Sequence, residues 1–358
     1  MWPYWVMFLV PAVAALQERW RHPGWILAAP VLRRGRAWWL VALALTLLIG
    51  YRFEVGGDWF NYIGNFYNLQ WLELADVLRM SDPGYYLLNW LSIQNGGFIY
   101  AVNLVAGLLF SLGLVVFCLS LPRPWLALAA AIPYLVIVVA MGYSRQGVAI
   151  GLAMLGLVAL VRDGSTLKFI IWIALAASFH RSAVMLVPIA ALSMGRGKYW
   201  TVLWVGIATI VLYFLFLDDS VDSLLSGYIE AEYQSQGAAI RIAMNALPSA
   251  LFLLLRRRFP LLPGEWLLWR NMAVLSLGFV VLLVISPSST AVDRVALYLI
   301  PVQLFVLARL PDAFPSRRAG VDPMVLFVVM YSAAVQFVWL NFAGHSNAWV
   351  PYQLYPLV

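Results

Sequence analysis

The sequence predicts an all-α integral membrane protein of about 12 transmembrane helices, with both termini on the outer side. Of its 358 residues, 63% are hydrophobic and only 11% are charged, whereas soluble domains average about 25% charged residues. Lipid is therefore the expected solvent. The connectors and span ends of one side carry 17 Lys and Arg against 5 Asp and Glu, and those of the other side carry 6 against 11. The basic side is expected to face the cytoplasm.

Twelve apolar stretches and their short connectors use up the chain, so residues 1–358 are expected to form a single polytopic membrane domain. The first stretch lacks the basic flank of a cleavable signal and is expected to be retained. The predicted spans are 3–16, 37–50, 98–121, 125–142, 146–161, 167–179, 182–195, 199–217, 239–255, 266–285, 294–309 and 322–340.

The connectors between these spans differ in charge and length. Basic residues of the cytoplasmic connectors account for the net charge of +7, so this charge does not indicate nucleic-acid binding. Two outer loops are long, over 51–97 and 218–238. Within the first, residues 83–91 are expected to form a short amphipathic helix along the membrane interface. Cys118 is the one cysteine, which excludes an intrachain disulfide.

The outer segment 51–62 places an aspartate at the membrane surface. Two glycines allow a tight turn just before Asp58, which is followed by Tyr62. A carboxylate there can take a proton from a sugar hydroxyl when a partly apolar setting raises its pKa. The alternative is an interfacial turn in which Arg52 pairs with Glu54 or Asp58.

Two short polar turns carry arginine between predicted spans. Arg145 and Gln146 lie in an almost loop-free junction, where a lone arginine is costly unless it snorkels or finds an anionic partner. The planar guanidinium group suits phosphate oxygens. His180 and Arg181 form the second turn. There, His180 either exchanges a proton near neutral pH or serves as a structural residue at a helix end.

The last two polar segments lie near the C-terminus. Asp293 is expected to cap the helix that it opens, and Arg294 then points to the outer surface. The tail over 341–352 is polar and aromatic and contains His345 and Tyr352. Aromatic rings beside amides suit a sugar-binding surface, and an aromatic belt at the membrane interface explains them equally well.

All of these groups fall on the charge-poor, outer side. Arginines, histidines and one glycine-flanked aspartate on one face predict an anion-binding cleft with a proton acceptor. No His or Cys spacing typical of a metal site occurs. The acids over 218–222 are interpreted as a solvated loop rather than a cation site. Neither a metal nor another cofactor is expected.

The polar segments resemble those of the EpsG-like family of bacterial polysaccharide polymerases, which is related in role to the Wzy-type O-antigen polymerases. Their order and sidedness extend the resemblance over nearly the whole chain. The family usually has Gly-Thr-Asp where this chain has Gly56-Gly57-Asp58, so the aspartate is kept and the hydroxyl is not. The resemblance rests on the segments 52–62, 144–146 and 179–182, on Asp293-Arg294 with Tyr298, and on 349–352.

This resemblance implies a GT-C-like glycosyltransferase of the bacterial inner membrane, with its active face toward the periplasm or the exterior. Its donor and acceptor would be oligosaccharides linked to undecaprenyl pyrophosphate. The donor glycan would be moved en bloc onto the acceptor, and undecaprenyl pyrophosphate would leave. A chain-length regulator is expected as a further partner, as in related pathways.

The resemblance also suggests residue roles. Asp58 is the first candidate for the base, with His180 as its rival, and Arg52 would hold Asp58 ionised or contact the donor. The charge of the leaving pyrophosphate can be stabilised without a metal by three arginines: Arg145, Arg181 and Arg294. Other polar residues on this face are expected to bind the pyrophosphate or the glycan: Gln146, Tyr62, His345 and Tyr352.

Three other functions stay open at this point. Transporters commonly show internal repeats and charges near the middle of the bilayer. A flippase for lipid-linked oligosaccharide is disfavoured, because this chain shows no repeat and its charges collect at one surface. A glycan ligase, or a transferase that uses a polyprenyl-phosphate sugar, would carry the same kinds of residue. A non-catalytic assembly partner would tolerate the loss of all the outer arginines.

Overall fold

The computed structural model describes residues 1–18, 35–189, 237–262, 264–316 and 320–358, with a few further positions between 203 and 211. The described chain is almost entirely helical. Within it, five helical stretches are long and apolar enough to cross a membrane: α7 (Ile99–Leu119), α9 (Ser144–Arg162), α15 (Glu265–Ile285), the stretch Ser289–Ala313 and α18 (Pro323–Phe342). The stretch Ser289–Ala313 comprises α16 (Ser289–Ala296), η8 (Leu297–Leu299) and α17 (Ile300–Ala313).

The other apolar helices are shorter. They are α1 (Trp2–Gln17), α3 (Arg36–Gly50), α8 (Pro124–Ala131) with the π-helical η3 (Ile132–Ala140), α10 (Thr166–Phe179) and α14 (Ala238–Leu254). Helices suit these apolar segments because a helix satisfies its own backbone hydrogen bonds in lipid. Ten of the twelve predicted spans therefore coincide with helices, and the chain is an all-α membrane protein.

The other two predicted spans fall wholly or partly outside the described residues. The span 182–195 begins in the 3₁₀ helix η4 (Arg181–Leu186) and is described only to residue 189. Of the span 199–217 only a few positions between 203 and 211 are described, and nearly all of the outer loop 218–238 lies outside the described part of the chain. The number of twelve spans and the outward termini therefore stay predictions.

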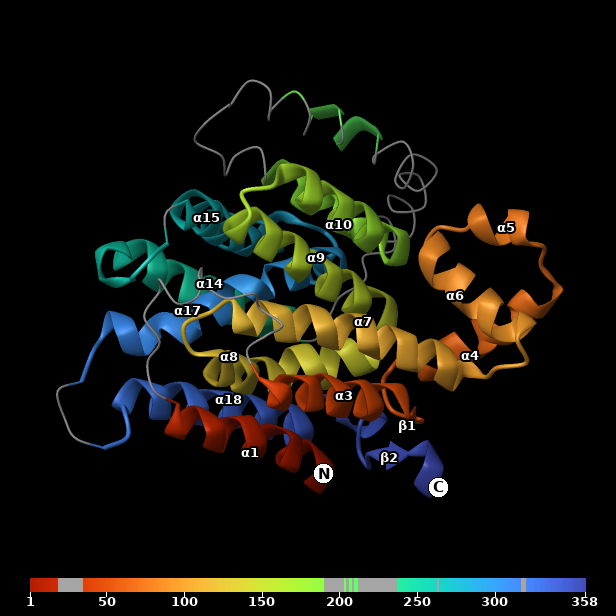
Figure 1. Cartoon of the computed structure of the whole chain (residues 1–358), viewed down its shortest axis with the longest axis horizontal. Coiled ribbons are helices and arrows are strands. Elements are labelled where there is room, and N and C mark those ends of the chain that lie inside the picture. The colour runs from red at the N-terminus through yellow and green to blue at the C-terminus, as the bar shows by residue number, and fades with distance from the viewer. Residues whose placement is uncertain are drawn as a thin grey trace.

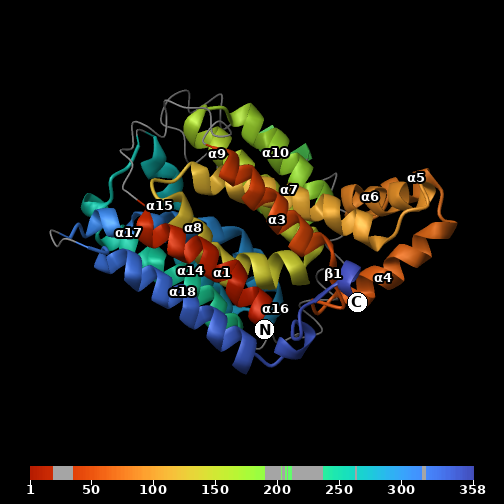
Figure 2. The same ribbon diagram turned by 60° about the horizontal axis from the view of Figure 1, so that its bottom comes forward.

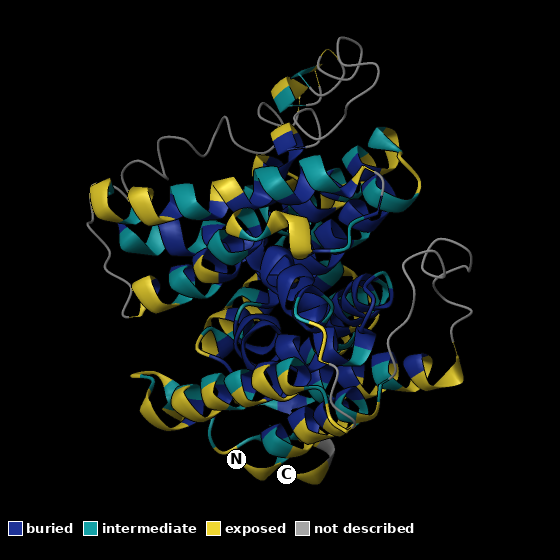
Figure 3. Ribbon diagram, turned by 90° about the vertical axis from the view of Figure 1, so that its left-hand side faces the viewer, coloured by how far each residue is buried: buried dark blue, intermediate teal, exposed yellow. Residues whose placement is uncertain are grey.

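The helices pack around a buried centre formed by α7, α8, α9 and α17. Helices α3, α7, α9 and α10 lie side by side in this order, while α1, α17 and α18 all pack on α8 (Figure 1). Helix α14 packs on α15 and α17. Exposed residues gather on the outward faces of the peripheral helices, and the ribbon is dark blue along the middle of the bundle (Figure 3).

The outer segment 51–97 is mostly helical rather than an extended loop. It contains α4 (Trp59–Asn68), η2 (Leu69–Trp71), α5 (Leu74–Leu78) and α6 (Pro83–Gln94), which lie together at one end of the bundle (Figure 2). The predicted helix over 83–91 is confirmed as α6. Helix α4 forms because Trp59, Tyr62 and Phe66, spaced three and four residues apart, bury one face against α6 and α7.

The two termini meet beside the start of this segment (Figure 2). Strand β1 (Arg52–Phe53) pairs antiparallel with β2 (Gln353–Leu354). The Tyr4 hydroxyl donates to the carbonyl oxygen of Trp349 at 2.6 Å. The N-terminal helix and the C-terminal tail therefore hold the same corner of the fold.

Candidate active site

A buried arginine begins the outer segment. Arg52 is 1% exposed, and its Nη1 and Nε donate to carbonyl oxygens of its own turn at 2.6 and 3.2 Å. Its Nη2 donates to Oγ of Ser144, the first residue of α9, at 2.6 Å. In the described structure no ion pair joins Arg52 to Glu54 or Asp58, so the interpretation of an acid–arginine turn is wrong. Arg52 instead ties the turn to the start of α9.

The two glycines before Asp58 differ in how much space surrounds them. Gly56 has φ of 109°, and its amide donates to Ala348 O at 2.8 Å. A Cβ on Gly56 would lie 2.5 Å from the carbonyl oxygen of Met141. A Cβ on Gly57 would lie 3.6 Å from the nearest atom of Trp349, an ordinary contact. Gly56 therefore sets the turn, and Gly57 has room for a side chain.

We expect Gly56→Ala to lower the free energy of unfolding by about 1–3 kcal/mol, because alanine is strained at this φ. Gly57→Thr, which introduces the residue usual in the family that the sequence resembles, is expected to change it by less than about 0.5 kcal/mol. Thermal unfolding of the purified variants in one detergent checks the difference. Equal losses in the two variants would contradict this account of the turn.

Asp58 lies next to a buried tyrosine. It precedes α4, is half-buried, and makes no capping hydrogen bond with its side chain. Burial raises the pKa of Tyr62, while the charge of Arg145 lowers it and that of Asp58 raises it. The guanidinium carbon of Arg145 lies 5.9 Å from the centre of the Tyr62 ring. The predicted base and a predicted pyrophosphate ligand thus have Tyr62 as a common neighbour.

Arg145 has an acidic partner that the sequence analysis did not single out. Its Nη1 donates to Oδ2 of Asp82 at 2.7 Å, and the two side chains are 29% and 7% exposed. Asp82 precedes α6 at the N-cap position but makes no capping hydrogen bond, although such a cap is worth about 1 kcal/mol. Its Oδ1 accepts from the backbone N–H of Arg181 at 3.2 Å. Burial raises the pKa of Asp82, while Arg145 lowers it.

His180 lies among three arginines at the end of α10. Its pKa is lowered from 6.5 to about 3, first by burial and then by the positive charges of Arg145, Arg294 and Arg181. The imidazole is therefore neutral at physiological pH. Its buried Nδ1 has no hydrogen-bond partner among the described residues, so it can bond to a ligand.

We expect His180 to make the folded protein sensitive to acid. Its pKa is about 3 in the folded protein, against 6.5 for an ordinary histidine side chain. Below pH 6.5 the unfolded chain therefore binds the extra proton, and stability falls as pH falls toward 3. The loss of stability between pH 7.5 and pH 5 is expected to be smaller in His180→Gln. Thermal unfolding at both pH values measures this, and an identical loss in variant and wild type would contradict it.

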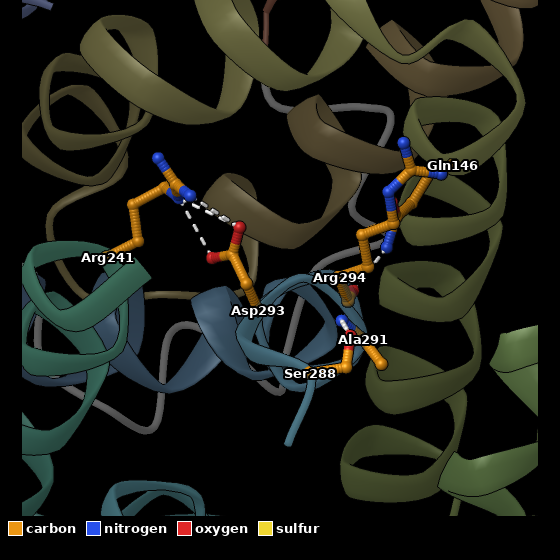
Figure 4. A network of polar contacts seen from close by, with 6 residues as sticks. All are labelled: Gln146, Arg241, Ser288, Ala291, Asp293 and Arg294. Atoms are coloured by element: carbon orange, nitrogen blue, oxygen red, sulfur yellow. Dashed lines mark hydrogen bonds and ion pairs between the residues drawn. The ribbon is translucent and has the colours of Figure 1, made fainter. Parts of the chain in front are cut away.

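Asp293 and Arg294 point in different directions from α16 (Figure 4). The prediction that Asp293 caps the helix is wrong, because Ser288 is the N-cap and its side chain accepts from the amide of Ala291. Asp293 lies inside the helix and binds Arg241 through both carboxylate oxygens, with the shortest bond 2.6 Å. The guanidinium carbon of Arg294 lies 5.8 Å from the ring centre of Tyr143.

Gln146 holds α16 against α9. Its Nε2 donates to the carbonyl oxygen of Arg294 at 2.5 Å (Figure 4). Because this bond ties its side chain to the backbone of Arg294, Gln146 helps to set the position of Arg294. Burial raises the pKa of Tyr143, and Asp58 raises it further, so Asp58 is also near the tyrosine that Arg294 faces.

The C-terminal tail braces the site. The Tyr352 hydroxyl donates to Leu48 O at 2.7 Å, and Nε1 of the buried Trp349 donates to Ile137 O in η3 at 2.7 Å. His345 is exposed. The tail therefore supports the turn that leads to Asp58. That His345 and Tyr352 bind substrate stays a prediction.

The structure thus brings together most of the predicted residues and adds two. Within the described residues, no three His, Cys, Asp or Glu side chains are placed to hold a metal ion, and a metal-free mechanism stays a prediction. Asp82 and Arg241 were missed because each lies far along the chain from its partner, by 63 and 52 residues. The residues gathered around His180 and Tyr62 come from five segments: Asp58, Asp82, Arg145, Arg181 and Arg294.

This arrangement suits an anionic ligand. Guanidinium groups bind phosphate oxygens in a planar, directional way, and the neutral His180 adds a hydrogen-bonding nitrogen without charge. In comparisons with known proteins, residues 36–354 match the EpsG family. No curated protein and no solved structure matches the chain.

Proposed function

The chain belongs to the EpsG family, and we propose that it is a membrane glycosyltransferase that polymerises lipid-linked repeat units of a polysaccharide. The family suggests a polysaccharide polymerase-like role. The observation that carries the proposal further is the gathering of Arg145, Arg181 and Arg294 around His180. A transferase that expels a pyrophosphate needs such fixed positive charge where negative charge develops.

In the proposed reaction, the donor is a glycan on undecaprenyl pyrophosphate and the acceptor is another lipid-linked unit. The three arginines bind the donor pyrophosphate. Asp58 takes the proton from an acceptor hydroxyl as that oxygen bonds to the anomeric carbon of the donor. The bond from this carbon to the phosphate oxygen breaks, and undecaprenyl pyrophosphate leaves with the electron pair. His180 is the alternative proton acceptor.

The setting of this reaction is part of the proposal. We place the site at the outer face of the bacterial inner membrane, in a single GT-C-like domain with twelve spans and both termini outside. The positive-inside charge sorting supports this orientation. A lipid-linked substrate reaches such a site within the membrane plane. No metal takes part in the proposed step, and a chain-length regulator is the proposed further partner.

One reconstitution tests the function. Purified protein in liposomes is incubated with lipid-linked repeat units, and the products are separated on a gel, with Arg145→Ala as the inactive control. A ladder of increasing chain length supports a polymerase. A single transfer to an unrelated acceptor supports a ligase, and movement of the lipid between leaflets without lengthening supports a flippase. Either of the last two results overturns the proposal.

A further inference from the structure

One carboxylate connects the outer helices to the arginines around His180. Asp82 stands at the start of α6, and its two oxygens bind different segments. Oδ2 accepts from Arg145 at the start of α9, at 2.7 Å. Oδ1 accepts from the amide of Arg181 after α10, at 3.2 Å. The side chain is 7% exposed, so these bonds are largely shielded from water.

Close packing fixes where this carboxylate lies. A Cβ on Gly84, the second residue of α6, would lie 2.5 Å from Oγ and 3.1 Å from the carbonyl oxygen of Ser178. Ser178 lies two residues before His180, near the end of α10. The glycine therefore lets the start of α6 approach the end of α10 closely. This contact brings Asp82 within reach of the amide of Arg181.

Asp82 holds its arginine differently from the other acid near the site. Asp293 binds Arg241 through both oxygens, and these side chains are only 10% and 12% exposed. Asp82 binds Arg145 through Nη1, and 29% of the Arg145 side chain stays exposed. Asp293 thus covers an edge of its guanidinium group, whereas Asp82 binds one nitrogen of Arg145 and leaves that side chain partly exposed.

We propose that Asp82 is a positioning residue that orients Arg145 and anchors Arg181 for binding a pyrophosphate, and that it links this site to the outer helices. The inference rests on the proposed function. Helix α4 of the same outer segment carries Tyr62 and follows Asp58. Asp82 therefore fixes the position of the outer segment, which carries the proposed base Asp58, relative to Arg145 and Arg181, which bind the leaving pyrophosphate.

The test uses undecaprenyl pyrophosphate as the probe, with the purified full-length protein in nanodiscs. Asp82→Asn is expected to weaken its binding by about tenfold or more, the size typical of a lost bond to a charged group. In the Arg145→Ala background, Asp82→Asn is expected to add little, because residues that act through each other are not additive. Effects that multiply, or tighter binding by Asp82→Asn, would overturn the proposal.

Further variants separate positioning from folding. Gly84→Ala keeps the carboxylate but displaces α6 from Ser178, and is expected to weaken probe binding as Asp82→Asn does. Gly64→Ala, at a position in α4 with no atom within 4 Å of an added Cβ, is the matched control and is expected to bind normally. Asp76→Asn, an exposed acid in α5, serves in the same way. Normal binding by Gly84→Ala would count against the linkage.

The binding measurement keeps this inference separate from the polymerase assignment. If reconstitution gives no ladder but Asp82 and Arg145 are coupled in probe binding, the function fails and the positioning role stands. If a ladder forms and the two residues act independently on binding, the polymerase stands and the positioning role fails. Asp82→Glu, which keeps the charge, is expected to recover more binding than Asp82→Asn, and equal weakness in the two would oppose an ionic role.

Discussion

Arg145→Ala is expected to lower the rate of polymer formation by about 10²–10³, the usual cost of removing one group that stabilises developing charge. The guanidinium group of Arg145 contacts Asp82 and Tyr62, and it lowers the pKa of His180. It therefore stands where the outer helices, α9 and the α10–η4 turn meet. The measurement is polymer length in cells on a gel, together with turnover of lipid-linked units by the purified variant.

Two matched variants sharpen this result. Arg145→Lys keeps the charge but loses the planar fork that suits phosphate, and it is expected to remain well below wild type. Arg79→Ala removes an exposed arginine of the same outer segment and is expected to behave as wild type. Normal long chains from Arg145→Ala would remove this residue from the mechanism.

Hydropathy predicted the helices well because it reflects the membrane directly. Each apolar stretch must satisfy its backbone within lipid, and a helix is the local solution. The outer segment 51–97 was harder, since only α6 was predicted there. Helix α4 left a signal in the spacing of Trp59, Tyr62 and Phe66, all buried on one face. Its ten residues form a helix because this face finds a partner in the folded chain.

The site was predictable as a set of residues but not as a set of contacts. The assignment of connectors to the two sides of the membrane predicted Arg145, Arg181 and Arg294 on one face. The structure places them around His180. Which acid neutralises which arginine depends on tertiary packing. Asp82 was not predicted as a site residue, because sequence gives no measure of how deeply a connector folds into the bundle.

The side chains of two adjacent residues have different partners, which sequence alone does not reveal. Asp293 and Arg294 are neighbours, and on a helix of 3.6 residues per turn they point about 100° apart. Asp293 therefore reaches Arg241 on α14, while Arg294 lies beside Gln146 on α9 (Figure 4). The cap assignment failed because the helix begins earlier, with Ser288, five residues before Asp293, as its N-cap.

The choice of base gives the second large expected effect. Asp58→Asn is expected to lower turnover by about 10²–10⁴, the usual contribution of a positioned general base. Asp58 is half-buried, and its side chain does not cap α4. His180 is half-buried beside three positive charges, which lower its pKa and make its neutral nitrogen a weak proton acceptor. The carboxylate is therefore better placed to meet an acceptor hydroxyl arriving from outside.

The comparison is made with purified Asp58→Asn, His180→Ala and Glu54→Gln in the same assay of lipid-linked units. Glu54 is an exposed acid of the same turn, and its variant is expected to keep wild-type turnover. Because asparagine matches aspartate in shape, a loss in Asp58→Asn with unchanged thermal unfolding reports chemistry rather than folding. If Asp58→Asn turns over normally while His180→Ala does not, the proton goes to the imidazole. The arginines would then bind the phosphate and also lower the basicity of His180. Bound pyrophosphate would neutralise their charge and so restore the basicity of His180.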